Sequence, residues 1–141
     1  MYNLLKINSN NENHIEILYK LLTKKKFNIS HETLPLLDHH KIFVKNNPYR
    51  EWYFIQKSSE IIGSVYITKD NVIGINIPEA QENEYLHSIK LIIEKHNPLE
   101  AIKSVRSKSF CINSNPKNKV LIKALEKLNM EHIENTYRFK D

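Results

Sequence analysis

The stretch that decides the fold covers residues 61–81 and reads IIGSVYITKDNVIGINIPEAQ. Apolar side chains alternate with polar or small ones on both sides of a short turn at residues 69–71. Alternation with a period of two on both sides of a turn predicts two antiparallel strands, over residues 61–68 and 72–77. Pro78 then ends the second strand and begins a helix, because proline cannot donate to a strand ladder but fits the first turn of a helix.

Outward from this stretch, the spacing of apolar residues switches between the strand period and the helix period. In chain order, the predicted elements are a strand over 1–7, a helix from 12 that ends near 24–26, a helix over 37–44, strands over 52–55, 61–68 and 72–77, a helix from 79 that stops at 96–98, a strand over 108–113, a helix over 117–128 and a strand over 130–139. This order predicts one α/β (α+β) domain over residues 1–141, with a mixed sheet that carries helices on its faces.

Composition narrows the classes of protein that fit. The chain has 141 residues, a net charge of +5 and one cysteine. One cysteine excludes an intramolecular disulfide and indicates a reducing compartment, so we expect a cytoplasmic protein. No apolar run approaches the roughly 18 residues that cross a bilayer, which argues against a membrane partner. No basic helix with base-reading spacing and no aromatic RNA-stacking motif is present, which argues against a nucleic-acid partner.

Three stretches resemble motifs of the GNAT N-acetyltransferases. Residues 61–67 (IIGSVYI) resemble a strand of that family with an early glycine, and residues 73–81 (IGINIPEAQ) resemble its central strand running into the cofactor loop. Residues 118–130 (NKVLIKALEKLNM) resemble its asparagine-led helix, with Asn129 in the usual glycine position. The resemblance covers nearly the whole chain and implies a GNAT-like, mostly antiparallel sheet of six to seven strands flanked by about four helices.

This resemblance implies an enzyme that transfers an acetyl group from acetyl-CoA directly to a primary amine of a small molecule or amino-sugar. In GNAT proteins the central strand bulges and parts from the next parallel strand, and the pantetheine arm enters the gap as an added strand would. The pyrophosphate lies on backbone N–H groups where the following helix begins, and an N–H near Ile77 would face the oxyanion. The cofactor-binding residues implied are Asn76, Ile77, Gln81, Glu82, Asn83, Glu84, Tyr85, Asn113 and Asn118.

The chain departs from the family pattern in two places. The pyrophosphate loop of the family reads Gln/Arg-x-x-Gly-x-Gly/Ala, whereas residues 81–86 read QENEYL, so that only Gln81 matches. Glu84 stands in place of the first glycine and would crowd and repel a dianion, although acidic residues also suit the first turn of any helix. Many members of the family carry a tyrosine on the asparagine-led helix that acts as the general acid, and Leu125 stands at that position here.

Five residues are candidates for proton transfer, namely Glu79, His31 and Glu51 as bases and Tyr137 and Tyr66 as acids. Glu79 and His31 are candidate bases: Glu79 lies at the end of the central strand, and His31 lies in the loop that lines the acceptor site in GNAT folds. Tyr137 on the last predicted strand is a candidate acid. Each also has a structural explanation, namely a helix start for Glu79, a surface loop for His31 and strand packing for Tyr137. The residues expected to contact the acceptor are His31, Tyr49, Trp52 and Tyr66.

Other chemistry finds less support in the sequence. The histidines show no metal-ligand spacing with a cysteine or aspartate partner, so we expect no metal. Cys111 lies in an apolar strand and is read as a buried structural residue. The degenerate loop and the missing tyrosine leave an alternative open, in which a catalytically inactive GNAT-like fold serves as a binding or assembly module. Edge strands also leave a homodimer open.

Overall fold

The computed structural model describes residues 1–27 and 33–140, and within them the strands form one five-stranded sheet in the order β1-β2-β3-β4-β5. The strands are β1 (Tyr2–Lys6), β2 (Glu51–Lys57), β3 (Glu60–Ile67), β4 (Val72–Asn76) and β5 (Cys111–Ile112). The first four pair antiparallel with their neighbours, whereas β5 pairs parallel with β4. The predicted three-strand meander is therefore confirmed, and it forms the centre of the sheet.

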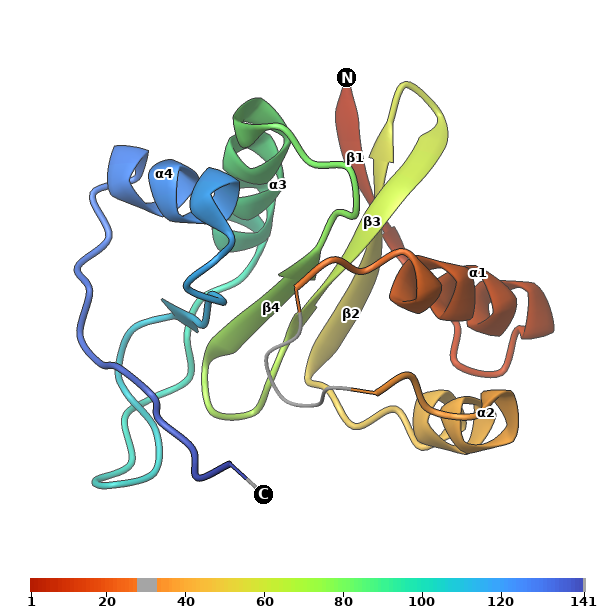
Figure 1. Ribbon diagram of the computed structural model, residues 1–141, viewed down its shortest axis with the longest axis horizontal. Coiled ribbons are helices and arrows are strands. Elements are labelled where there is room, and N and C mark those ends of the chain that lie inside the picture. The colour runs from red at the N-terminus through yellow and green to blue at the C-terminus, as the bar shows by residue number, and fades with distance from the viewer. Residues whose placement is uncertain (28–32, 141) are drawn as a thin grey trace.

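Two helices lie on each face of the sheet (Figure 1). The helices are α1 (Glu12–Thr23), α2 (Leu37–Lys45), α3 (Glu82–Lys95) and α4 (Lys119–Lys127). Strand β2 shows why both faces are covered: Trp52 and Phe54 pack with α1 and α2, while Tyr53 and Ile55 pack with α3 and α4. Because successive strand side chains point to opposite faces, four consecutive buried residues require a layer on each side. The two layers leave the end of β4 accessible between them.

The helix ends follow ordinary capping chemistry. The Asn11 side chain accepts a hydrogen bond from His14 N at the start of α1, and the Asn118 side chain accepts one from Leu121 N at the start of α4. At the end of α4, Asn129 has φ 58°, and Met130 N donates to Leu125 O. This is a Schellman motif, whose left-handed residue is usually glycine. The structure thus explains why Asn129 stands in the glycine position.

Both glycines of the chain serve close packing within the sheet. A Cβ at Gly63 would overlap the backbone oxygen of Asn76, and a Cβ at Gly74 would overlap the ring of Tyr66. Gly74 and Tyr66 are opposite each other in the β3–β4 ladder. Neither glycine lies in a phosphate-binding loop.

The structure corrects the predicted strand count. The strand predicted over 130–139 is wrong: residues 130–140 form no helix or strand, and residues 131–140 are all exposed. The sequence alternates there, but no neighbouring element buries the apolar side chains, so the pattern has nothing to pack against. The strand predicted over 108–113 is shortened to the two residues of β5.

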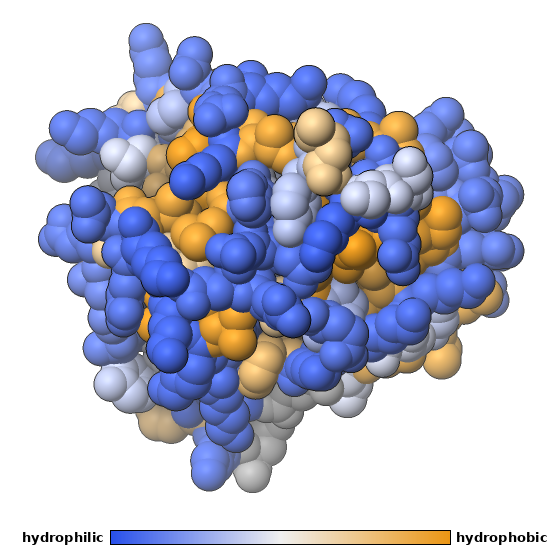
Figure 2. All heavy atoms as spheres, turned by 90° about the horizontal axis from the view of Figure 1, so that it is seen from above, coloured by the Kyte–Doolittle hydropathy of each residue, from blue (hydrophilic) through white to orange (hydrophobic). Residues whose placement is uncertain are grey.

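The expected bulge in the central strand is also absent from the described ladder. Strand β4 pairs with β3 in continuous register from Ile73 to Asn76, and the irregularity lies instead between β2 and β3, at Ile55/Gln56. None of the described helices is long and apolar enough to cross a membrane. Hydrophilic side chains cover most of the face in Figure 2, with apolar residues exposed in separate patches between them.

Candidate functional site

Strands β4 and β5 part after two paired positions. Their register comprises only Val72↔Cys111 and Ile73↔Ile112, after which β4 continues to Asn76 while the chain leaves β5 for α4. A cavity of about 270 Å³ lies where the two chains separate. Its lining residues are Lys25, Lys26, Phe27, Ile75, Asn76, Ile77, Pro78, Glu79, Ala80, Tyr85, Asn115, Asn118, Val120 and Leu121.

Backbone groups of β4 face this cavity. The carbonyl of Val72 accepts from Thr68 N on the β3 side, whereas the carbonyl of Asn71 accepts from Cys111 N on the β5 side. Because backbone groups alternate sides along a strand, the N–H groups of Ile75 and Ile77 point toward the β5 side, beyond the last paired residue. These two amides are therefore available to a ligand that enters the gap.

The wall opposite β4 contains a buried polar pair. Asn118 Nδ2 donates a hydrogen bond of 3.3 Å to the Tyr85 hydroxyl, and Asn118 Oδ1 accepts from Leu121 N. Both side chains are buried, and burial raises the pKa of Tyr85. The Tyr85 hydroxyl consequently stays protonated at neutral pH, and Tyr85 is one of the residues that line the cavity.

The mouth of the cavity is charged. Lys25, Lys26 and Phe27, which follow α1, lie against Glu79 at the end of β4. Lys26 Nζ and Glu79 Oε2 form an exposed ion pair of 3.3 Å. Lys25 is partly buried, and burial lowers the pKa of its ammonium group.

The start of α3 is occupied by the protein's own carboxylate. Gln81 N donates to Glu84 Oε1 at 2.8 Å, and Glu84 Oε2 pairs with Lys57 Nζ at 3.2 Å. Glu82 pairs with Lys127 at 2.6 Å. The lysines reduce the repulsion that these carboxylates would exert on a phosphate, and no hydrogen bond among those described uses the amides of Glu82 and Asn83.

The structure brings most of the cofactor-binding candidates together. Asn76, Ile77, Tyr85 and Asn118 line one cavity, and the candidate base Glu79 lines it with them. The other loop candidates, Gln81, Glu82, Asn83 and Glu84, form the start of α3 directly after it. Asn113 does not line the cavity, whereas Asn115 does.

Asn76 has a positioning role as well. Its side-chain amide donates to Leu21 O at 3.2 Å, which ties the end of α1 to β4.

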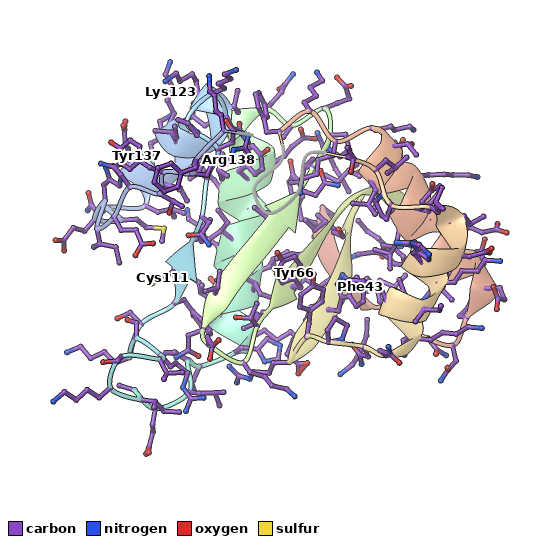
Figure 3. The ribbon with its side chains drawn as sticks, turned by 60° about the horizontal axis from the view of Figure 1, so that its bottom comes forward. Phe43, Tyr66, Cys111, Lys123, Tyr137 and Arg138 are labelled. Carbon is purple, nitrogen blue, oxygen red and sulfur yellow. The ribbon has the colours of Figure 1, made fainter. Side chains whose placement is uncertain are left out.

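The acceptor candidates are placed elsewhere. Tyr49 and Tyr66 stack with ring centroids 3.8 Å apart, and Trp52 packs on Tyr49 in an edge arrangement. This cluster lies on the α1/α2 face and does not line the cavity. Figure 3 shows its member Tyr66 on the side of the molecule where Phe43 of α2 lies. Burial raises the pKa of Tyr49 and of Tyr66, as expected for packed phenols. His31 lies outside the described residues.

The candidate acid Tyr137 does not approach the cavity. Its side chain is 88% exposed, and Figure 3 shows it on the side of the molecule where α4 lies, away from Phe43 and Tyr66. Sequence reasoning assigned Tyr85 only to cofactor binding and missed that its hydroxyl lies beside Asn118. It also missed Lys25 and Asn115, because only the fold brings these residues to the gap. Within the described residues, no group of three or more His, Cys, Asp or Glu side chains could hold a metal ion.

Comparison with known proteins places this geometry in a fold family. No family model matches the chain, and no curated protein matches it in sequence. A solved structure described as "a possible acetyltransferase from Clostridium difficile 630" superposes with a TM-score of 0.56 at 12% identity, over 100% of this chain and 98% of that chain. Aminoglycoside N-acetyltransferase AAC(6')-Iy, in complex with a CoA bisubstrate analog, superposes with a TM-score of 0.63 at 11% identity, over 100% and 98% of the two chains. The chain has the GNAT acetyltransferase fold.

A third GNAT structure extends the comparison. Aminoglycoside N-acetyltransferase AAC(6')-Ib11 superposes with a TM-score of 0.54 at 15% identity, over 90% of this chain and 84% of that chain. In the GNAT fold of this chain, the parting of β4 and β5 lies where the resemblance implies a site for the pantetheine arm.

Proposed function

We propose that this protein is an acyl-CoA-dependent N-acetyltransferase that transfers the acetyl group of acetyl-CoA to a primary amine of a small molecule. The observation that carries the proposal is the gap between β4 and β5, with the amides of Ile75 and Ile77 directed into it. An extended pantetheine chain with its own amides can pair with such a strand. The residues present therefore fit the co-substrate.

The proposed reaction is a direct transfer. The amine nitrogen attacks the thioester carbonyl carbon, a C–N bond forms, and the C–S bond breaks as the thiolate leaves. The Ile77 N–H stabilises the oxyanion, and Glu79 accepts the proton released by the amine. The Tyr85 hydroxyl, oriented by Asn118, donates its proton to the departing thiolate.

The test is an assay of thiol release from acetyl-CoA with a panel of primary amines. Tyr85→Phe should lower kcat by about 100-fold, the usual range for loss of a general acid, while the Kd for CoA stays within about twofold. Tyr2→Phe, on the far edge strand, is the control and should retain full activity. If Tyr85→Phe keeps wild-type kcat, Tyr85 is not the proton donor, and if wild-type protein acetylates none of the amines, the enzymatic proposal is overturned.

One observation favours a second function. The Glu84 carboxylate occupies the start of α3, where GNAT enzymes hold a pyrophosphate, and this arrangement suits a binding or assembly module that no longer uses CoA. Calorimetry separates the two functions. Measurable CoA binding favours the enzyme, whereas no heat of binding at millimolar CoA favours the module.

A further inference from the structure

Lys25 is a cation in the cavity wall that takes part in none of the ion pairs described for the site. Lys26 pairs with Glu79, but Lys25 forms no ion pair with any residue in the described part of the chain. Lys25 is partly buried, whereas its neighbours Lys24 and Lys26 are exposed. The more accessible Lys26 is thus the paired side chain, whereas the less accessible Lys25 has no ion-pair partner among the described residues.

Burial of an ammonium group is unfavourable unless an anion or hydrogen-bond acceptor compensates for the lost hydration. The lowered pKa of Lys25 reflects this burial. The charged residues described in the cavity lining are Lys25, Lys26 and Glu79, so their formal charge is +1 after the one ion pair. The cavity therefore presents an excess positive charge next to the amides of β4.

We infer that Lys25 forms an anion subsite at the mouth of the cavity, which binds a phosphate or carboxylate group of a molecule held between β4 and α4. The inference rests on the proposed function in that this molecule is either acyl-CoA, through its phosphates, or an amine acceptor that carries an acidic group. A polycationic acceptor would place like charges against Lys25, so it fits this mouth poorly.

The subsite can be tested without CoA. ¹⁵N-labelled protein is titrated with inorganic pyrophosphate, and the backbone amides of Lys25, Phe27 and Ile77 are followed by NMR. We expect saturable shifts at these amides, with binding weakened at least about tenfold in Lys25→Gln and unchanged in Lys24→Gln, which removes the same charge one residue away. If both variants bind pyrophosphate equally, or the shifts lie elsewhere, the inference is overturned.

A second pair of measurements identifies the source of the anion. If it is the co-substrate, Lys25→Gln weakens the binding of CoA but not of pantetheine, which has no phosphate. If it is the acceptor, CoA binding is unchanged, and Lys25→Gln raises KM for amines that carry a carboxylate but not for neutral amines. If the wild-type protein binds CoA and acetylates amines, but neither CoA binding nor KM for either class of amine responds to Lys25→Gln more than to Lys24→Gln, the subsite has no role in the reaction and the inference is overturned.

Failure of this inference differs from failure of the proposed function. Wild-type protein that binds pyrophosphate through Lys25, yet neither binds CoA nor acetylates an amine, supports the subsite and overturns the acetyltransferase. Equal rates of acetylation by Lys25→Gln and Lys24→Gln would support the acetyltransferase and overturn the subsite.

Discussion

At the scale of single residues, Asn71 organises the connection between α3 and β5. Its side chain donates to Leu99 O and Ser107 O and accepts from Leu99 N, each at 2.8 Å. It is fully buried and has φ 66°. The sequence identified this residue only as part of a turn, because its partners are about 30 residues away and nothing local indicates them.

We expect Asn71→Ala to lower the free energy of unfolding by about 3 kcal/mol, because buried backbone groups lose their partners and alanine disfavours positive φ. Urea denaturation measures the change. Asn129→Ala is the matched control: Asn129 also has positive φ but is exposed, so we expect a loss of about 1 kcal/mol. Equal losses in the two variants would show that the side-chain hydrogen bonds of Asn71 contribute nothing.

Glu84 is the residue that most directly opposes phosphate binding. Glu84→Gln retains a side chain that can accept from Gln81 N but removes the charge. We expect CoA to bind several-fold more tightly at low salt, with a smaller gain at high salt as the charges are screened. Calorimetry measures both, with Glu94→Gln, which is exposed near the other end of α3, as the control. Weaker binding in Glu84→Gln would contradict this account of the loop.

At the scale of elements, α1 and α2 are joined by a buried histidine. His40 Nε2 donates to Ile15 O at 3.2 Å, and the ring packs against Tyr19. Burial lowers the pKa of His40, and the hydrogen bond to Ile15 only partly opposes this. Because the pKa is lower in the folded chain than in the unfolded chain, the unfolded chain takes up the proton first as the pH falls. The stability associated with neutral His40 is therefore present above the ordinary histidine pKa and is lost below it.

We expect the melting temperature of the wild type to fall between about pH 8 and about pH 5.5, and to fall less in His40→Gln. Thermal melts followed by circular dichroism check this. His39→Gln, at the exposed neighbouring position, should retain the wild-type pH dependence. An unchanged pH dependence in His40→Gln would show that another group causes it.

Element types were largely predictable because local patterns determine them. The meander, the four helices and the Asn118 cap follow from periodicity and capping residues that lie within a few positions of one another. The prediction of a strand over 130–139 was wrong for the opposite reason. Its alternating pattern is a local signal, whereas a strand also needs a neighbouring strand to pair with. Likewise, the side chains that line the cavity depend on how α1 and α4 approach β4, which no local pattern encodes.

At the scale of the whole molecule, the C-terminal segment over residues 131–140 lies outside the packed core. Ile133, Tyr137 and Phe139 are 65%, 88% and 101% exposed, so they bury little apolar surface. We expect truncation after Met130 to change the melting temperature by less than about 2 °C. As a control, the full-length double variant Tyr137→Asp, Phe139→Asp should also show a melting temperature within about 2 °C of the wild type. A large loss of stability on truncation would show that this segment pairs as a strand, as its sequence pattern predicted.

The proposed class of reaction rests on the gap between β4 and β5, whereas the proposed class of acceptor rests on the mouth of the cavity. The two parting strands were predictable from the order of the elements and the resemblance to GNAT enzymes. The charge at the mouth was not, because Lys25 and Glu79 are 54 positions apart and line the same cavity only in the folded chain.

The central claim is that the gap between β4 and β5 holds the pantetheine arm of acyl-CoA. A crystal structure of the protein with CoA tests it most directly. We predict electron density for pantetheine hydrogen-bonded to the backbone of β4 at Ile75 and Ile77, with the sulfur near the Tyr85 hydroxyl. A complex in which CoA lies outside this gap, or in which β4 and β5 close along their whole length, would contradict the account.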